Sequence, residues 1–255
     1  MTLTCGVDVG GTKIAGAVVD LDGNVLEEHR VESPATDTEA IEDAIAGLVG
    51  ELAARHRIEA VGVGAAGYIS ASRAQVMFAP NLAWRDVDLK AELEERVDVP
   101  VVIENDANAA AWGEFRFGAA ADADDLLLVT VGTGVGGGIV WNGELFRGSF
   151  GAAAEIGHIR VVPDGRPCGC GNHGCLEQYG SGSALGKQAR AAAHTPEAAT
   201  LLAAAGGDPE QITGPMITEL AQAGDAFAVA QLAELGRWLG EGIATLAAVL
   251  DPAVV

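Results

Sequence analysis

The chain is poor in basic residues. It has 15 Lys and Arg against 36 Asp and Glu, which gives a formal net charge of −21 at pH 7 over 255 residues. An envelope this acidic repels the phosphate backbone of nucleic acids. We therefore expect no nucleic-acid partner.

Long apolar runs are also missing. The amino-terminal stretch MTLTCGVDVGG has neither a basic region nor a long apolar core, and the most apolar later run, residues 243–250, stops at Asp251 and Pro252. A membrane-spanning helix needs about 20 apolar residues, and a secretory leader needs a basic start before its apolar core. The sequence predicts a soluble, cytoplasmic protein with no membrane partner.

Cysteine is scarce, yet three of the four cysteines fall within eight residues. These are Cys168, Cys170 and Cys175, and His158 precedes the first of them by ten positions. Three thiolates and one imidazole suit tetrahedral Zn²⁺. A disulfide would leave one thiol over, and no secretory signal supports an oxidising compartment. His173 could compete as the fourth ligand, but we favour His158. The remaining cysteine, Cys5, lies in an apolar strand, where a buried and inert thiol is expected.

The length and the strand pattern predict two lobes. A sequence of strand, glycine turn, strand, tight turn and strand covers residues 3–31, and residues 126–143 repeat its first part and its tight turn. A chain of 255 residues is long for one compact core, so two lobes around a cleft are expected.

The rest of the chain alternates strands and helices. We expect helices at 38–56, 89–97, 105–117, 176–194 and 225–250, strands at 60–65 and 101–104, and a loop through Tyr68, Pro80, Asn81 and Trp84. This alternation is typical of α/β proteins. The predicted lobes are residues 1–107, a small amino-terminal lobe, and 108–255, a larger lobe that carries the cysteine loop and the carboxyl-terminal helices.

Two glycine turns are candidate phosphate sites. In the first, Gly10 and Gly11 let backbone N–H groups approach an anion, Thr12 adds a hydroxyl and Lys13 a charge. The turn lacks the P-loop spacing and no helix follows. Residues 132–137 and 62–67 match GxGxxG, but neither opens a helix, so both are weak as dinucleotide fingerprints. Each turn alone could be an ordinary hairpin, whereas two homologous turns favour phosphate binding.

A polar cluster follows the apolar strand at 101–103. Glu104, Asn105, Asp106 and Asn108 emerge at the carboxyl end of that strand, where α/β sheets place their ligands. A carboxylate there can accept a proton from a bound hydroxyl. Alternatively, Asn105 or Asp106 only caps the next helix. The two roles are compatible, because each uses a different oxygen.

Five motifs together resemble the ROK family of sugar kinases, most closely its bacterial, actinobacterial-type glucokinases. They are DVGGTKIAG at residues 8–16, ENDANAAAWGE at 104–114, GTGVGGGI at 132–139, AEIGHI at 154–159 and CGCGNHGCLEQY at 168–179. The resemblance implies the actin-like ATPase, ribonuclease H-like duplicated fold. It also implies ATP-dependent phosphorylation of the 6-hydroxyl of D-glucose, giving glucose 6-phosphate and ADP.

The resemblance also implies roles for single residues. Asp106 is implied as the general base, and Asp8 as the residue that holds Mg²⁺ through water. The backbones of Gly10, Gly11, Thr12, Lys13, Thr133 and Gly134 are implied to bind the ATP phosphates. The implied sugar ligands are Asn105, Asp106, Glu155, His158 and Glu177, with Gly67 and Asn81 as further contacts. Zinc on His158 and the three thiols is implied to be structural, because the protein fills all four ligand positions. One ring nitrogen of His158 can bind the metal while the other faces the sugar.

Several alternatives stay open. The chain stops before the family's last adenosine-binding segment, so a truncated record is expected and the adenine contacts cannot be named. The sugar could instead be fructose, N-acetylmannosamine or N-acetylglucosamine, or the chain could be a truncated, catalytically silent sugar-binding module. A transcriptional repressor would need a helix-turn-helix before the strand that starts at Leu3. Polyphosphate could replace ATP, and a homodimer or tetramer is expected by resemblance alone.

Overall fold

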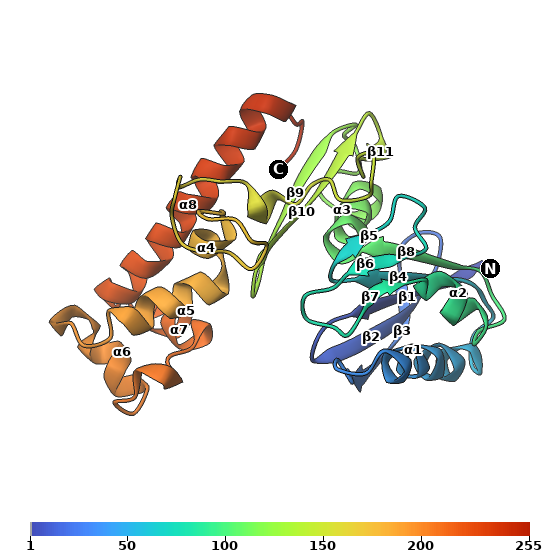
Figure 1. Ribbon diagram of the computed structural model, residues 1–255, viewed down its shortest axis with the longest axis horizontal. Helices are drawn as coiled ribbons and strands as arrows, with labels where there is room; N and C mark the ends of the chain where they lie inside the picture. The colour runs from blue at the N-terminus through green and yellow to red at the C-terminus, as the bar shows by residue number, and fades with distance from the viewer. Residues whose placement is uncertain (1) are drawn as a thin grey trace. The chain divides into compact units, whose positions relative to one another are not determined.

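The computed structural model describes residues 2–255, which form two compact units. Of these residues, unit 1 comprises 2–128, 138–154 and 253–255, and unit 2 comprises 129–137 and 155–252. Figure 1 shows the helices and strands of both units. The boundary between the units passes through the hairpin of residues 126–141.

Unit 1 is built on a five-stranded sheet. Its strands run in the order β3-β2-β1-β4-β8. β1, β2 and β3 form an antiparallel meander, whereas β4 and β8 add to β1 in parallel. The strand bounds are β1 Leu3–Val9, β2 Lys13–Val19, β3 Val25–Glu32, β4 Ile58–Ala65 and β8 Val101–Asn105.

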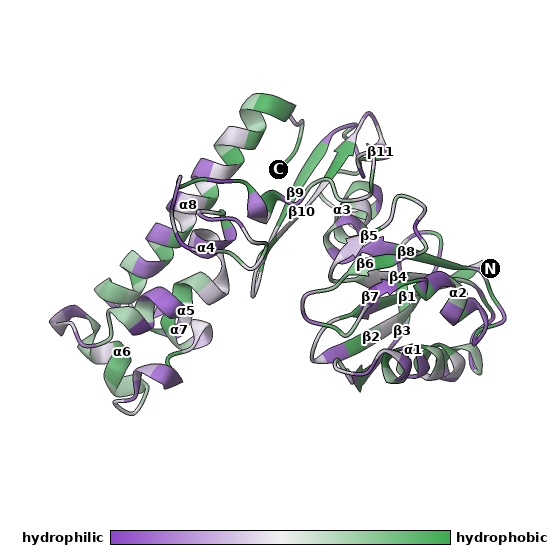
Figure 2. Cartoon of the chain, viewed as in Figure 1, coloured by the Kyte–Doolittle hydropathy of each residue, from purple (hydrophilic) through white to green (hydrophobic). Residues whose placement is uncertain are grey.

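One face of this sheet is buried beneath helix α1 (Thr38–Ala53). Asp37 caps α1 by accepting the Ala40 N–H at 3.1 Å, as an N-cap aspartate does. The apolar side chains of α1 and of alternate strand positions form one core, which includes Val7, Ile14 and Leu52. In Figure 2 the inner strands of this sheet are largely green, as expected for strands buried in a core.

Helix α3 (Asp106–Phe117) begins directly after β8 and packs on the sheet. A Cβ on Gly64 of β4 would lie 3.7 Å from the Asp106 Cα and 3.8 Å from the Ala109 Cβ. These are ordinary van der Waals distances, so the first turn of α3 packs directly against the strand. Helix α2 (Leu89–Glu94) is capped by Asp88 and also belongs to unit 1.

The predicted loop through Tyr68, Pro80, Asn81 and Trp84 is confirmed at Pro80, Asn81 and Trp84 and was wrong at Tyr68, which belongs to a small antiparallel sheet. Its strands are β5 (Tyr68–Ile69), β6 (Val76–Phe78) and β7 (Arg85–Val87). Strands of two or three residues are too short to show an alternating pattern in the sequence. Trp84 is fully buried in the core of unit 1.

A third sheet repeats the strand and glycine-turn pattern. Its order is β11-β10-β9, with bounds β9 Leu126–Val131, β10 Val135–Trp141 and β11 Glu144–Leu145. The second strand begins at Val135, directly after the glycine turn at residues 132–134. Val254 forms a parallel bridge with Leu126. The predicted internal repeat is therefore present in the structure.

Unit 2 is mainly helical. The predicted helix at 176–194 is two helices, because Ser181 ends the first and caps the second by accepting the Ala184 N–H at 3.1 Å. The long helix at the carboxyl end confirms the prediction for 225–250. The bounds are η1 Ile156–His158, α4 Glu177–Gly180, α5 Gly182–Ala191, η2 Pro196–Ala198, α6 Ala199–Ala204, η3 Pro209–Gln211, α7 Gly214–Gln222 and α8 Ala226–Leu250.

The compact units differ from the predicted lobes 1–107 and 108–255. Most of α3 and of the β10–β11 hairpin lies after residue 107, yet both belong largely to unit 1. In the case of α3, the reason is that the helix packs on β4 and β8. The lobe boundary stays a prediction. Over residues 2–255, no helix is both long and apolar enough to cross a membrane.

Candidate functional site

The first glycine turn joins β1 to β2 in unit 1. The Gly10 N–H donates to the Lys13 carbonyl at 3.0 Å, which closes the turn. A Cβ on Gly11 would lie 3.2 Å from the Asn81 carbonyl oxygen, so Asn81 borders this turn. Thr12 and Lys13 are exposed. A narrow, backbone-lined turn with a hydroxyl and an ammonium group beside it has the composition of an anion site.

Two carboxylates lie beside that turn. Burial raises the pKa of Asp8, the charge of Asp106 raises it further, and Lys13 opposes both effects. The two negative charges are thus close enough to repel each other. A divalent cation would offset this repulsion, so the residues fit the Mg²⁺ that a nucleotide brings.

Asn105 is the N-cap of α3. Its Oδ1 accepts the Asn108 N–H at 2.9 Å, and its Nδ2 donates to the Gly67 carbonyl at 3.1 Å. Asp106, the first residue of the helix, is exposed and its Oδ1 accepts the Ala107 N–H at 2.9 Å. The structure therefore brings Gly67, Asn105 and Asp106 together at the end of β8.

Gly67 is tightly enclosed by backbone. A Cβ there would lie 2.4 Å from the Phe78 carbonyl oxygen and 2.9 Å from the Ala79 Cα. Only glycine fits this close approach. Its contribution to the polar cluster is the carbonyl that orients Asn105.

Two charged residues beneath this cluster, Arg73 and Arg147, were missed as functional candidates, and Glu104 was given no role of its own within the cluster. Glu104 is 8% exposed, and its Oε2 lies 2.8 Å from Arg147 Nε, 2.7 Å from Arg147 Nη2 and 3.3 Å from Arg73 Nε. Burial lowers the pKa of Arg73, the Glu104 charge raises it, and Arg147 lowers it further. The one signal in the sequence was a carboxylate that directly follows buried apolar residues.

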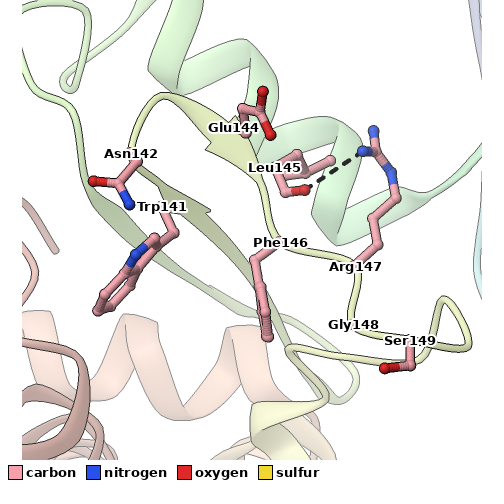
Figure 3. A pocket seen from close by; sticks show the side chains of 8 residues that line it. All are labelled: Trp141, Asn142, Glu144, Leu145, Phe146, Arg147, Gly148 and Ser149. Carbon is pink, nitrogen blue, oxygen red and sulfur yellow. Dashed lines mark hydrogen bonds between the residues drawn. The ribbon is translucent and has the colours of Figure 1, made fainter.

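A pocket of about 700 Å³ lies beside the β10–β11 hairpin. Figure 3 shows the rings of Trp141 and Phe146 directed away from the Arg147 side chain, which is bonded to the Leu145 carbonyl. None of the predicted site residues lines it. Among its lining residues, Arg147 is a partner of Glu104.

The second glycine turn, in unit 2, is held by a predicted sugar ligand. Glu177 Oε2 accepts the Val135 N–H at 3.2 Å, and a Cβ on Gly134 would lie 2.3 Å from the same oxygen. The start of α5 donates to the turn as well, from the Gly182 N–H to the Gly132 carbonyl at 2.8 Å. Thr133 and Gly134 are thus presented on a fixed turn, and Thr133 is exposed.

The short helix η1 carries Glu155 just before its start and His158 at its end. The His158 N–H donates to the Glu155 carbonyl at 3.0 Å, which keeps the two residues on one turn. A Cβ on Gly157 would lie 2.1 Å from the Val135 carbonyl oxygen, so η1 rests on the beginning of β10. Val135 therefore has Glu177 on its N–H and η1 on its carbonyl side.

The four predicted zinc ligands converge in unit 2. One ligand atom from each of His158, Cys168, Cys170 and Cys175 lies within 4.8 Å of all the others. Cys168 Sγ is 3.6 Å from His158 Nδ1, and Cys170 Sγ is 3.6 Å from Cys175 Sγ. Tetrahedral zinc with Zn–S bonds of about 2.3 Å places its ligands roughly 3.8 Å apart. The donor set and its spacing fit zinc.

The thiols of the cluster have different surroundings. Burial, followed by the neighbouring thiols, raises the pKa of Cys175 to about 12. For Cys170, burial acts to raise the pKa, but hydrogen bonds, chiefly from the Asn172 backbone, lower it overall. The Gln178 amide donates to Cys168 Sγ at 3.6 Å, as outer partners of ligating thiolates do. His173 is exposed and outside the cluster.

These features define an α/β protein of the actin-like ATPase class that carries a Cys3His metal cluster. Residues 4–255 match the sequence profile of the ROK family. The chain belongs to the ROK family. The resemblance stated from the motifs is thereby confirmed, and so is the fold class.

Three relatives are informative. The glucokinase of Streptomyces coelicolor is 53% identical over 254 residues, which cover 99% of this chain and 80% of the relative. The crystal structure of a ROK family glucokinase from Streptomyces griseus, in complex with glucose and AMPPNP, is 53% identical with a TM-score of 0.89, covering 99% of this chain and 82% of that one. The N-acetylmannosamine kinase of Escherichia coli is 36% identical over 210 residues, 82% of this chain and 71% of the relative.

Proposed function

We propose that this chain is an ATP-dependent glucokinase that phosphorylates the 6-hydroxyl of D-glucose, giving glucose 6-phosphate and ADP. The observation that carries the proposal is the 53% identity, over nearly the whole chain, to a glucokinase and to a ROK glucokinase solved with glucose and an ATP analogue. The polar cluster at the end of β8 supports it with suitable chemistry.

Asp106 is the proposed general base. Its Oδ1 accepts the Ala107 N–H, and in this proposal Oδ2 takes the proton of the sugar 6-hydroxyl. Removing that proton makes the oxygen a better nucleophile toward the γ-phosphorus of ATP. General-base assistance contributes about 10²- to 10⁴-fold in rate.

The nucleotide ligands are proposed on the two glycine turns. The backbones of Gly10 to Lys13 and of Thr133 and Gly134 would donate to phosphate oxygens, and Lys13 would add its charge. Asp8 would hold Mg²⁺ through water, consistent with the mutual repulsion of Asp8 and Asp106. The ion would supply neutralisation of the charge on the transferring phosphoryl group.

The sugar is proposed to be bound by the hydroxyl-reading side chains that the family resemblance assigns. These are Asn105, Asp106, Glu155, His158 and Glu177, with Gly67 and Asn81 as further contacts. His158 turns Nδ1 toward Cys168, which leaves Nε2 for a hydroxyl. Zinc on the Cys3His cluster would fix the ring orientation and would take no part in the chemistry.

A coupled assay on this chain tests the proposal. Glucose, fructose, mannose, N-acetylmannosamine and N-acetylglucosamine are each offered with ATP, and glucose is also offered with polyphosphate. Glucose with ATP is expected to give the highest kcat/KM. A chain that phosphorylates N-acetylmannosamine better than glucose would instead be an N-acetylmannosamine kinase, like the Escherichia coli relative. Failure with every sugar, together with glucose binding in isothermal titration, identifies a silent sugar-binding module.

Two further expectations, on location and on assembly state, accompany the proposal. We expect a cytoplasmic protein that assembles as a homodimer or homotetramer. Sedimentation at several protein concentrations measures the assembly state, and a monomer at all concentrations would contradict it.

A further inference from the structure

Glu104 stands two positions before Asp106, and its carboxylate is bordered by donor groups of Asn105, Asn108, Arg147 and Arg73. Oε1 lies 3.2 Å from the Asn105 N–H nitrogen and 3.3 Å from Asn108 Nδ2, while Oε2 faces Arg147 and Arg73. An ionised carboxylate only accepts, so it matches this environment on both oxygens. Asn108 is itself 2% exposed, so little water competes for its amide.

The two arginines bring separate loops to Glu104. Arg73 has φ 58°, a left-handed conformation unusual for a residue with a Cβ, and its carbonyl accepts the Ile103 N–H at 3.1 Å. The loop after Arg147 packs on the segment that leads to Arg73, since a Cβ on Gly151 would lie 2.1 Å from the Ile69 carbonyl oxygen. Glu104 is therefore the common partner of two loops and of the first turn of α3.

We propose that Glu104 is a positioning residue for phosphoryl transfer: its Oε1 fixes the start of α3, and its Oε2 is anchored by Arg147 and Arg73, so that Asp106 is aimed at its substrate. This inference rests on the proposed function. Glu104 acts through Asn105, whose N–H it accepts and whose side chain caps the helix that Asp106 begins. Misplacing a catalytic group by about 1 Å can lower the rate on the order of 10²-fold.

The test is Glu104→Gln, which keeps the size but adds an NH₂ donor. If the amide oxygen faces the arginines, the NH₂ faces two other donors at Asn105 and Asn108. The matched control is Glu42→Gln in the same unit, since Glu42 is 3% exposed and lies 3.2 Å from Arg96. Burial raises the pKa of Glu42, so a neutral side chain is tolerated there.

Steady-state kinetics, glucose titration and amide hydrogen exchange are measured on wild type and both variants. Glu104→Gln is expected to lower kcat about 10- to 100-fold, with a smaller change in the glucose dissociation constant. Faster exchange of the Asn105 and Asn108 amides should accompany this loss. Glu42→Gln is expected to keep the wild-type kcat and the wild-type exchange of those amides.

The outcomes separate the two proposals. A wild-type chain that phosphorylates no sugar overturns the proposed function, and this inference with it. An active wild type with Glu104→Gln at the wild-type kcat overturns the inference alone. If Glu104→Gln does not fold, Asn108→Ala removes only one donor to Oε1 and leaves the arginine contacts. It should then lower kcat with little change in glucose affinity, and an unchanged kcat overturns the inference.

Discussion

At the residue scale, Asp106 has a local structural task in addition to its proposed role as general base. As the first residue of α3 it places a negative charge where the helix dipole favours one, and its Oδ1 accepts the Ala107 N–H. The capping role that competed with catalysis in the sequence belongs to Asn105, whose Oδ1 accepts the Asn108 N–H. The second oxygen of Asp106 is thereby available for chemistry.

Asp106→Asn is expected to remove most turnover while the fold and the glucose affinity persist. Asparagine can still accept the Ala107 N–H, but it cannot take a proton, so kcat should fall about 10²- to 10⁴-fold. Coupled kinetics measures kcat, and isothermal titration measures glucose binding. Asp88→Asn is the control, because Asp88 also accepts an N–H at a helix start, from Ala91. An Asp106→Asn variant within tenfold of wild type would exclude the general-base role.

How far single residues could be predicted depended on sequence separation. The strand-end cluster was visible because Glu104 to Asn108 are consecutive, and the zinc ligands because three cysteines lie within eight residues. Arg147 was not visible as a partner of Glu104, because 43 positions separate them and no local spacing links them. Only the packing of the loops brings Arg73 and Arg147 to the same carboxylate oxygen.

At the scale of elements, the zinc loop, residues 158–178, holds few apolar side chains. Its backbone hydrogen bonds join residues of the loop itself, such as the Val161 N–H to the Gly174 carbonyl at 2.9 Å and the Gly171 N–H to the Cys168 carbonyl at 3.0 Å. A Cβ on Gly174 would lie 1.6 Å from the Val162 carbonyl oxygen, so the loop is tightly wound. Metal binding free energy is therefore expected to stabilise it.

Cys168→Ser is expected to abolish stoichiometric zinc binding, which should be one ion per chain in the wild type. Loss of the ion should free the His158 ring and weaken glucose binding, because both ring nitrogens then lack a fixed role. Elemental analysis of the purified chain measures zinc, and limited proteolysis measures loosening of residues 158–178.

Cys5→Ser is the matched control for that variant. Cys5 is 1% exposed in β1, and burial raises the pKa of its thiol to about 11. This variant should keep its zinc and its glucose affinity. Wild-type protein without zinc after expression in zinc-supplemented medium would contradict the metal assignment.

Predictability at this scale followed element length. Strands β1, β8 and β9 and helices α1 and α8 agree with the predicted segments within a few residues, because long apolar periods identify them. The three strands β5, β6 and β7 were missed, since each is two or three residues long. Ser181 was not recognised as a cap inside an apparently continuous helix, although serine is a preferred N-cap.

At the scale of the whole molecule, the two compact units have separate cores. The core of unit 1 packs α1 on the five-stranded sheet and includes Ile45, which is 1% exposed. A core in unit 2 includes Leu201 and Ile217, both fully buried among the carboxyl-terminal helices. Units with their own cores can unfold in separate steps, in which case one free energy of unfolding does not describe the chain.

We expect differential scanning calorimetry to resolve two unfolding transitions, each sensitive to its own core. Ile45→Ala and Ile217→Ala remove matched buried side chains, and each should destabilise its unit by about 2–5 kcal/mol. Each variant should therefore lower one transition by roughly 10 °C and leave the other in place. A zinc chelator should lower the same transition as Ile217→Ala, because all four ligands belong to unit 2. A single transition that both variants lower equally would show that the two cores unfold as one cooperative structure, and the division into units would then have no thermodynamic meaning.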